Sequence, residues 1–138
     1  MKKVALFPGR FQPPHLGHVI TIMRIYPIYD EILVAITEYT YEGTKKRVLP
    51  TRKIIRILEK LFAHLPKIKV VTIGRGIIER RSFDDLPPCN YIVSGNMGVI
   101  LAAEKAGYKA RLIPRADDLY YLRGETIREA FFKKPEVN

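Results

Sequence analysis

The chain has 138 residues, 47% of them hydrophobic, which suits a single domain of about 100–200 residues. No apolar run approaches the ~18 residues of a membrane-spanning helix or the ~7–15 of a signal-peptide core, so we expect a cytoplasmic domain over 1–138. Lys and Arg exceed Asp and Glu by 24 to 14, and this excess of +10 favours anionic ligands, although the basic residues are too spread out to indicate nucleic-acid binding.

Apolar runs typical of strands alternate with helical patterns along the chain. Val4–Phe7 is the first expected strand, and a loop rich in Gly and Pro joins it to a helix from Leu16 to about Tyr26, which Pro27 ends. Glu31–Ile36 is expected to be a buried strand. The later expected elements are a helix from Thr51, its N-cap, to about Leu65, strands over 69–73, 91–93 and 109–113, and helices over about 98–106 and 125–133.

This alternation predicts an α/β protein with a Rossmann-like, doubly wound sheet of five parallel strands in a single domain. Ligands of such folds bind beyond the carboxyl ends of the strands, so the loops after the first, second, fourth and fifth strands should line one cleft. Three segments are expected to meet there, namely 9–18, the basic loop Lys45-Lys46-Arg47 with Thr51-Arg52, and 123–128 at the start of the last helix. A basic loop alone is more often a solvated surface, and its place beside the other two favours a polyphosphate site.

The segment 9–18 contains two histidines, His15 and His18, with Gly17 between them. Their spacing of three places both imidazoles on one face of a first helical turn. There they can donate hydrogen bonds to an anion held over the helix N-terminus. Gly17 lacks a side chain, so a ligand can approach the backbone closely. Two unrelated surface histidines are the alternative interpretation of this spacing alone.

The ten residues from Gly9 to His18 resemble the first signature of nucleotidylyltransferases that share a His-x-Gly-His motif, and look most like archaeal-type nicotinamide-nucleotide adenylyltransferases. The resemblance continues in order through the basic loop, Ser-Gly-Asn at 94–96 and a late helix bearing Arg. It implies transfer of an adenylyl group from ATP to a phosphorylated acceptor, with release of pyrophosphate. The nucleotide-binding residues expected on this basis are Gly9, Arg10, Phe11, Gln12, Gly17, Ser94, Gly95, Asn96, Gly124 and Thr126.

Nucleotidyl transfer needs in-line positioning and hydrogen-bond donors, because negative charge accumulates on the equatorial and leaving oxygens. We expect His15 and His18 to donate to the triphosphate, which favours the cationic form of an imidazole. Arg128 is expected to hold the β- and γ-phosphates bidentately, and Arg10 or Arg47 to reach the phosphate of the acceptor. We expect no metal held by the protein itself, because Mg²⁺ keeps its waters and binds on the triphosphate.

The late motif departs from the family pattern Ser-x-Thr-x-x-Arg. Arg128 agrees with it, Gly124 agrees with a common choice at the second place, and Thr126 is shifted by one residue. Glu125 stands where the family has Thr, and a carboxylate there repels phosphate unless it points away or meets Mg²⁺. The departure bears on catalytic strength more than on the fold.

The acceptor is a second point of departure. Related archaeal-type enzymes stack a Trp on the nicotinamide ring, and this chain has no Trp. Phe83 either supplies that aromatic face or belongs to the core.

Nicotinamide mononucleotide, giving NAD, is the leading acceptor. Pantetheine phosphate, flavin mononucleotide and alcohol or sugar phosphates stay open, as does CTP in place of ATP. A weakly active nucleotide-binding relic is a further alternative, and the resemblance also implies self-association into a homo-oligomer.

Overall fold

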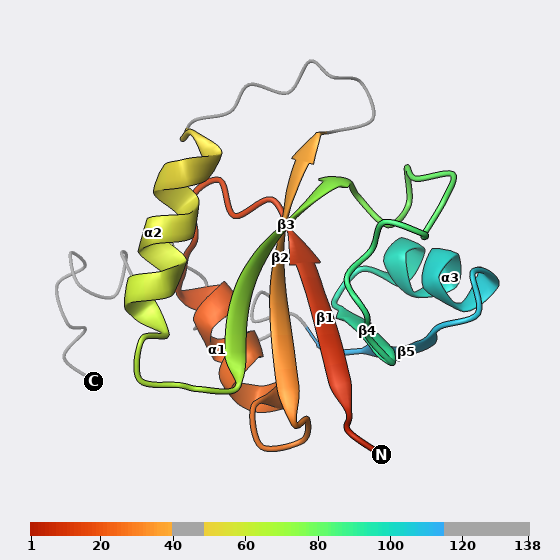
Figure 1. Cartoon of the computed structure of the whole chain (residues 1–138), viewed down its shortest axis with the longest axis horizontal. Helices are drawn as coiled ribbons and strands as arrows, with labels where there is room; N and C mark the ends of the chain where they lie inside the picture. The colour runs from red at the N-terminus through yellow and green to blue at the C-terminus, as the bar shows by residue number, and fades with distance from the viewer. Residues whose placement is uncertain (40–48, 115–138) are drawn as a thin grey trace, which may run out of the picture.

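The computed structural model describes residues 1–39 and 49–114, where strands alternate with helices as predicted except that the third strand is followed directly by the fourth (Figure 1). In chain order the elements are β1 (Val4–Gly9), α1 (Leu16–Ile25), β2 (Glu31–Tyr39), α2 (Thr51–Leu61), β3 (Ile68–Arg75), β4 (Tyr91–Ser94), α3 (Met97–Lys105) and β5 (Lys109–Leu112). The helix predicted over 125–133 lies outside the described residues. No helix in the described ranges is long and apolar enough to span a bilayer.

The strands form one sheet in the order β3-β2-β1-β4-β5, and every neighbouring pair is parallel. The chain adds β2 and β3 on one side of β1 and then returns to add β4 and β5 on the other. The strand order therefore reverses between β1 and β4, which is where open α/β sheets bind their ligands. The prediction of a five-stranded parallel sheet is confirmed.

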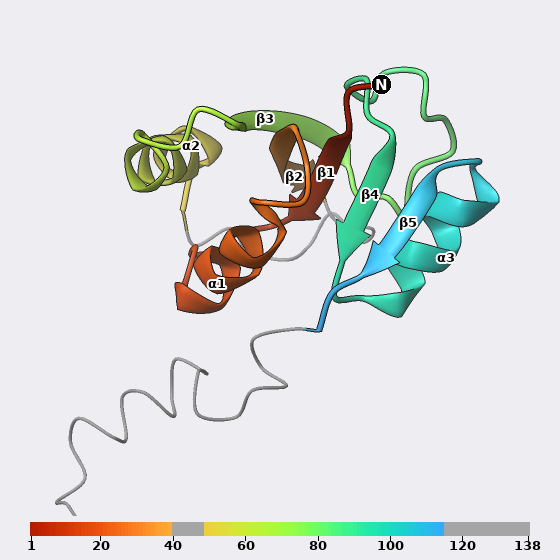
Figure 2. The ribbon, with the colours of Figure 1, turned by 90° about the horizontal axis from the view of Figure 1, so that it is seen from below.

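Helices cover both faces of the sheet (Figure 2). Because successive strand residues point to opposite faces, Phe7 packs with buried side chains of α1 and α2, whereas Leu6 packs in a second cluster with Ala103 of α3. β2 has no exposed face, and its residues from Ile32 to Ile36 are all at most 5% exposed. Its unbroken apolar run is what a strand covered on both faces requires.

Two predicted boundaries of the helix after the basic loop were wrong. Thr51 is the first residue of α2 and not its N-cap; Pro50 holds the cap position with φ −62° and ψ 147°, and makes no side-chain cap bond. The proline ring fixes that φ, so an extended residue directly precedes the helix. The helix ends at Leu61, short of Leu65, because Phe62 already leaves helical geometry at φ −110° and ψ 18°.

Candidate active site

A cavity of about 430 Å³ opens at the carboxyl edge of the sheet. Its walls come from the ends of β1, β2 and β4, the first turn of α1, and the segments that follow β3 and β5. The lining residues are Phe7, Pro8, Gly9, Arg10, His15, Gly17, His18, Thr21, Thr37, Gly76, Ile77, Ile78, Glu79, Ser94, Gly95, Asn96, Val99 and Ile113. The cleft is thus where the strand order reverses, and the segment after β3, which the sequence analysis left out, is part of it.

The side chains of His15 and His18 begin α1 by accepting backbone N–H groups at its N-terminus. The Nδ1 of His15 accepts the N–H of Gly17 at 3.0 Å, and the Nδ1 of His18 accepts the N–H of His15 at 3.0 Å. This is a reciprocal cap in which two imidazoles replace the usual hydroxyl and carboxyl groups. A neutral imidazole that accepts at one nitrogen carries its proton on the other, so both rings keep Nε2–H for a ligand in the cavity.

The two rings are stacked, with centroids 3.8 Å apart and planes inclined by 24°. Burial, and secondly the neighbouring His15, lower the pKa of His18 from its ordinary 6.5 to about 3. His18 is therefore a neutral donor at pH 7 in the free protein, and the cationic form that a bound triphosphate is expected to favour stays a prediction. A neutral Nε2–H still stabilises charge that develops on a phosphate oxygen.

Phe11 and Gln12 do not line the cavity in which they were expected to bind a nucleotide; Phe11 packs against His18, and Gln12 bonds to Leu49. Phe11 is 1% exposed and its ring lies 4.6 Å from that of His18, centroid to centroid. It adopts φ 54°, and its ring would lie only 3.0 Å from a Cβ placed on Gly9, so glycine is needed there. The side chain of Gln12 donates to the carbonyl of Leu49 and accepts its N–H, both at 2.9 Å.

Three other residues of the motif, which were expected to bind the nucleotide, do line the cavity. Gly9 ends β1, Arg10 follows it half-buried, and Gly17 is buried in the first turn of α1. Thr21, one turn further along α1, donates its hydroxyl to the carbonyl of Gly17 at 2.9 Å. Arg10 makes no salt bridge within residues 1–39 and 49–114, so its charge is available to an anion.

Ser94, Gly95 and Asn96 form the opposite wall. Ser94 ends β4 with 6% exposure, and its Oγ accepts the N–H of Asn96 at 3.0 Å. Asn96 is the N-cap of α3, because its Oδ1 accepts the N–H of Gly98 at 2.8 Å. The two side chains thus bring a second helix N-terminus to the cavity, beside that of α1.

The loop after β3 holds a further polar side chain that the sequence analysis missed, Glu79. It is half-buried in the cavity wall, next to Gly76. Its Oε2 is buried and has no hydrogen-bond partner in the part of the chain that the structure describes. The Gly-Arg-Gly sequence at 74–76 directly follows the strand expected over 69–73. It could have indicated that the chain makes a close turn there.

Phe83 is half-buried against the second core cluster and does not line the cavity, which favours the core interpretation over aromatic stacking. Its ring packs 5.6 Å from that of Tyr108, and the guanidinium of Arg80 lies 5.5 Å from its centroid. Four other predicted site residues lie outside the described residues, namely Arg47, Gly124, Thr126 and Arg128. Within the described ranges no three His, Cys, Asp or Glu side chains are grouped to hold a metal ion.

Together, the doubly wound sheet and the paired histidines at the end of its first strand define a nucleotide-binding α/β protein. The chain belongs to the cytidylyltransferase-like family, whose model matches residues 6–111. It is 31% identical to the nicotinamide-nucleotide adenylyltransferase of Pyrobaculum aerophilum, over 95% of this chain and 78% of that protein. The resemblance stated from the histidine motif is thereby confirmed.

A second kind of relative acts on a different acceptor. The chain is 34% identical to the phosphopantetheine adenylyltransferase of Bdellovibrio bacteriovorus, over 57% of its own residues, and it spans 48% of that protein's length. Among solved structures, a Vibrio parahaemolyticus protein described as a candidate nicotinate-nucleotide adenylyltransferase superposes with a TM-score of 0.61. At 16% identity it covers all of this chain and 85% of its own, and such a likeness shows the fold alone.

Proposed function

We propose that this protein transfers the adenylyl group of ATP to nicotinamide mononucleotide, forming NAD and releasing pyrophosphate. The observation that carries the proposal is the pair of imidazoles fixed by the reciprocal cap, with both Nε2–H groups left for a ligand at the N-terminus of α1. The similarity to archaeal nicotinamide-nucleotide adenylyltransferases over most of the chain supports this acceptor.

The reaction is an in-line displacement. An oxygen of the acceptor's phosphate attacks the α-phosphorus of ATP, the bond to the bridging oxygen of the β-phosphate breaks, and pyrophosphate leaves with that electron pair. His15 and His18 donate to the phosphate oxygens that gain charge, and the N-termini of α1 and α3 add backbone donors. Arg10 is placed to attract the phosphate of the acceptor.

The remaining predicted roles are part of the proposal. Arg128, with Gly124 and Thr126, would hold the β- and γ-phosphates, and Arg47 the phosphate of the acceptor. Mg²⁺ would enter on the triphosphate, because it binds few protein carboxylates and keeps several waters. We propose that the enzyme acts in the cytoplasm, where ATP is available to it, and that it self-associates.

Pantetheine phosphate is the second candidate acceptor, since relatives that use phosphopantetheine also match this chain. The cavity walls that would face either acceptor contain apolar side chains such as Ile77 and Ile78, which suit the nicotinamide ring and the pantetheine arm alike. Flavin mononucleotide and alcohol or sugar phosphates are the other acceptors to be compared.

The test is an assay of pyrophosphate release with Mg²⁺, ATP or CTP, and each acceptor, for the wild-type protein and two variants. His18→Asn keeps a side-chain oxygen that can accept the N–H of His15 but removes Nε2–H, whereas His18→Ala removes both. We expect NAD formation by the wild type and a fall in kcat of about 10²–10³-fold in both variants.

His64→Asn is the matched control, because His64 is exposed after α2 and outside the cavity, and it should keep the wild-type rate. A wild-type rate in His18→Asn would remove the assigned mechanism. Absence of pyrophosphate release with every donor and acceptor would favour the nucleotide-binding relic.

A further inference from the structure

Glu79 places a carboxyl oxygen with no hydrogen-bond partner among the described residues in the wall of a cavity that should receive two anionic substrates. Its Oε2 is buried without a hydrogen-bond partner among the described residues. Removing a carboxylate oxygen from water without such a partner costs free energy, so a ligand that donates a hydrogen bond would recover it. The proposed reaction has so far given Glu79 no role.

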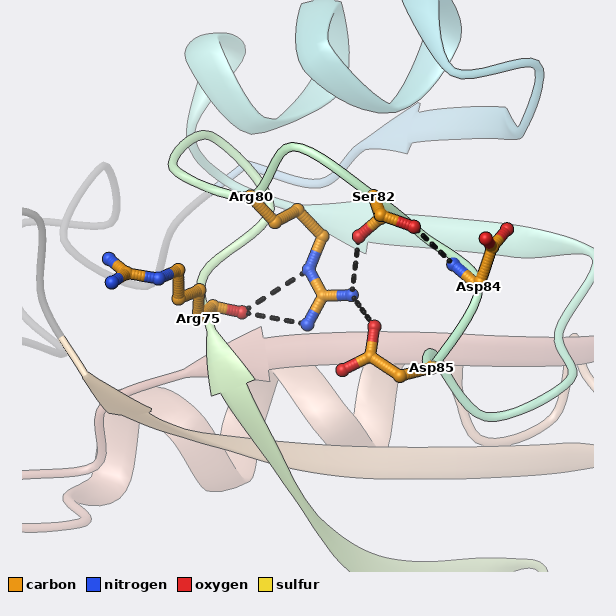
Figure 3. A network of polar contacts seen from close by, with 5 residues as sticks. All are labelled: Arg75, Arg80, Ser82, Asp84 and Asp85. Atoms are coloured by element: carbon orange, nitrogen blue, oxygen red, sulfur yellow. Dashed lines mark hydrogen bonds and ion pairs between the residues drawn. The ribbon is translucent and has the colours of Figure 1, made fainter.

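Among the residues that the structure describes, the adjacent Arg80 does not pair with Glu79, because its guanidinium is engaged elsewhere. Arg80 directs both its Nε and Nη2 at the carbonyl of Arg75, at 3.4 and 3.1 Å (Figure 3). Its Nη1 donates to the carbonyl of Ser82 at 3.2 Å and to Asp85 at 2.9 Å. This network holds the loop after β3 in shape and leaves the carboxylate of Glu79 without Arg80 as a partner.

The same loop is held in place at both of its ends. A Cβ on Gly76 would lie 3.0 Å from Oε2 of Glu79 and 3.5 Å from Cγ2 of Thr37, so the glycine makes room for the carboxylate beside the end of β2. Ile78 reaches the other side, where its Cδ1 would lie 3.1 Å from a Cβ on Gly98 at the start of α3. Gly76 and Gly98 thus leave room for the side chains of Glu79 and Ile78 between the end of β2 and the start of α3.

A carboxylate in this position selects among substrate groups by their charge. It repels a triphosphate or a monophosphate, so the part of a substrate that lies against it is one that carries no negative charge. It accepts a hydrogen bond from an N–H of a neutral amide, and it repels a second carboxylate. Nicotinamide and nicotinate mononucleotide differ in this one group, an amide against a carboxylate.

We propose that Glu79 is a specificity-determining residue of the acceptor subsite, accepting an N–H of the acceptor's carboxamide and excluding the corresponding acid. This inference rests on the proposed function, since it assigns the subsite of that same reaction. The apolar Ile77 and Ile78 beside it would enclose the ring that carries the amide.

The test compares kcat/KM for nicotinamide mononucleotide and for nicotinate mononucleotide, each with ATP and Mg²⁺, in the wild type and in Glu79→Gln. The variant keeps the shape of the side chain and supplies an N–H in place of the negative charge. We expect the wild type to prefer the amide by at least about tenfold, and Glu79→Gln to reduce that preference by about tenfold or more. A ratio of two substrates does not change when part of a preparation is unfolded.

Glu59→Gln is the control, because it makes the same substitution at an exposed position of α2 and should leave the preference unchanged. Equal use of both mononucleotides by the wild type, or an unchanged ratio in Glu79→Gln, would overturn the inference while the proposed reaction stands. Use of neither mononucleotide by the wild type, with adenylylation of pantetheine phosphate instead, would overturn the proposed acceptor and this inference with it.

Discussion

In each of the two histidines of the motif, one ring nitrogen has a structural role and the other is left for a ligand. Nδ1 accepts a backbone N–H in both, which orients the ring and assigns the proton to Nε2. A protonated His18 would have no lone pair at Nδ1 for the N–H of His15, so protonation would cost the cap as well as the desolvation of a charge. Burial, and secondly the neighbouring His15, are the causes of the low pKa of His18.

The lowered pKa makes the stability of the protein depend on pH. Unfolded, His18 takes up a proton near its ordinary 6.5, whereas in the folded protein burial holds its pKa near 3. Between these values the unfolded chain binds more protons, so stability is full above about pH 6.5 and falls as the pH drops towards 3, by at most about 1.4 kcal/mol per pH unit. Urea unfolding at pH 7 and at pH 4.5 measures the loss.

Two variants test that this dependence comes from His18. His18→Asn removes the titrating group and should flatten the pH dependence, whereas His64→Asn, at an exposed position, should leave it as in the wild type. The same slope in His18→Asn as in the wild type would contradict the assignment.

At the scale of elements, α1 and α3 present their N-termini to the same cavity, and neither has an acidic residue in its first turn. An acid there would satisfy the helix dipole internally and compete with a bound phosphate. Imidazoles and an amide cap the two helices instead, so the positive ends stay available to anions.

Two variants of Asn96, the N-cap of α3, distinguish an effect on the free energy of unfolding from an effect on ATP binding. Asn96→Ala removes the acceptor for the N–H of Gly98 and should lower the free energy of unfolding by about 1 kcal/mol. Asn96→Asp keeps an acceptor oxygen and should keep that stability, but its charge repels the triphosphate and should raise the KM for ATP several-fold. Urea unfolding and initial rates at varied ATP distinguish the two; an unchanged KM in Asn96→Asp would place the triphosphate away from α3.

At the scale of the whole molecule, the cavity is a product of topology. Its walls come from the ends of strands that are far apart in sequence, such as the segments around Gly9, Thr37 and Ser94. Only the doubly wound sheet brings these segments to one edge (Figure 1). The unfolded chain therefore has no equivalent site.

A ligand that binds only the folded state stabilises it by mass action. Mg²⁺-ATP at about 100 times its Kd should stabilise the protein by roughly 2.7 kcal/mol, seen as a rise in Tm. CTP and inorganic phosphate at the same concentration are the controls, and a larger rise with ATP would identify the base of the donor. No rise with either nucleotide would contradict a nucleotide site in this cavity.

The fold was predictable because its signals are local. Alternating apolar runs and helical patterns carry the order of the elements, and the bounds differed only at ends such as Thr51 and Leu61, where one or two backbone angles decide. The motif of His15 and His18 was also visible, since both residues lie within one turn of one helix.

The roles of Phe11, Gln12, Phe83 and Glu79 could not be assigned in the same way. Each depends on a contact that the folded chain creates, or on the lack of one: Phe11 with Phe7 and His18, Gln12 with Leu49, Phe83 with Tyr108. The burial of a side chain and its hydrogen-bond partners depend on the packed molecule, so they cannot be predicted from the spacing of residues along the chain.

The sequence by itself determined the class of fold, the family and the pair of imidazoles, because periodicity and a ten-residue motif are written along the chain. Tertiary structure alone decided that His18 is a neutral donor, that Phe11 packs beside it outside the cavity, and that a buried oxygen of Glu79 lies in the cavity wall without a partner among the described residues. The physical reason is that pKa values and hydrogen-bond partners depend on which groups exclude water from one another, and the folded sheet decides which groups those are.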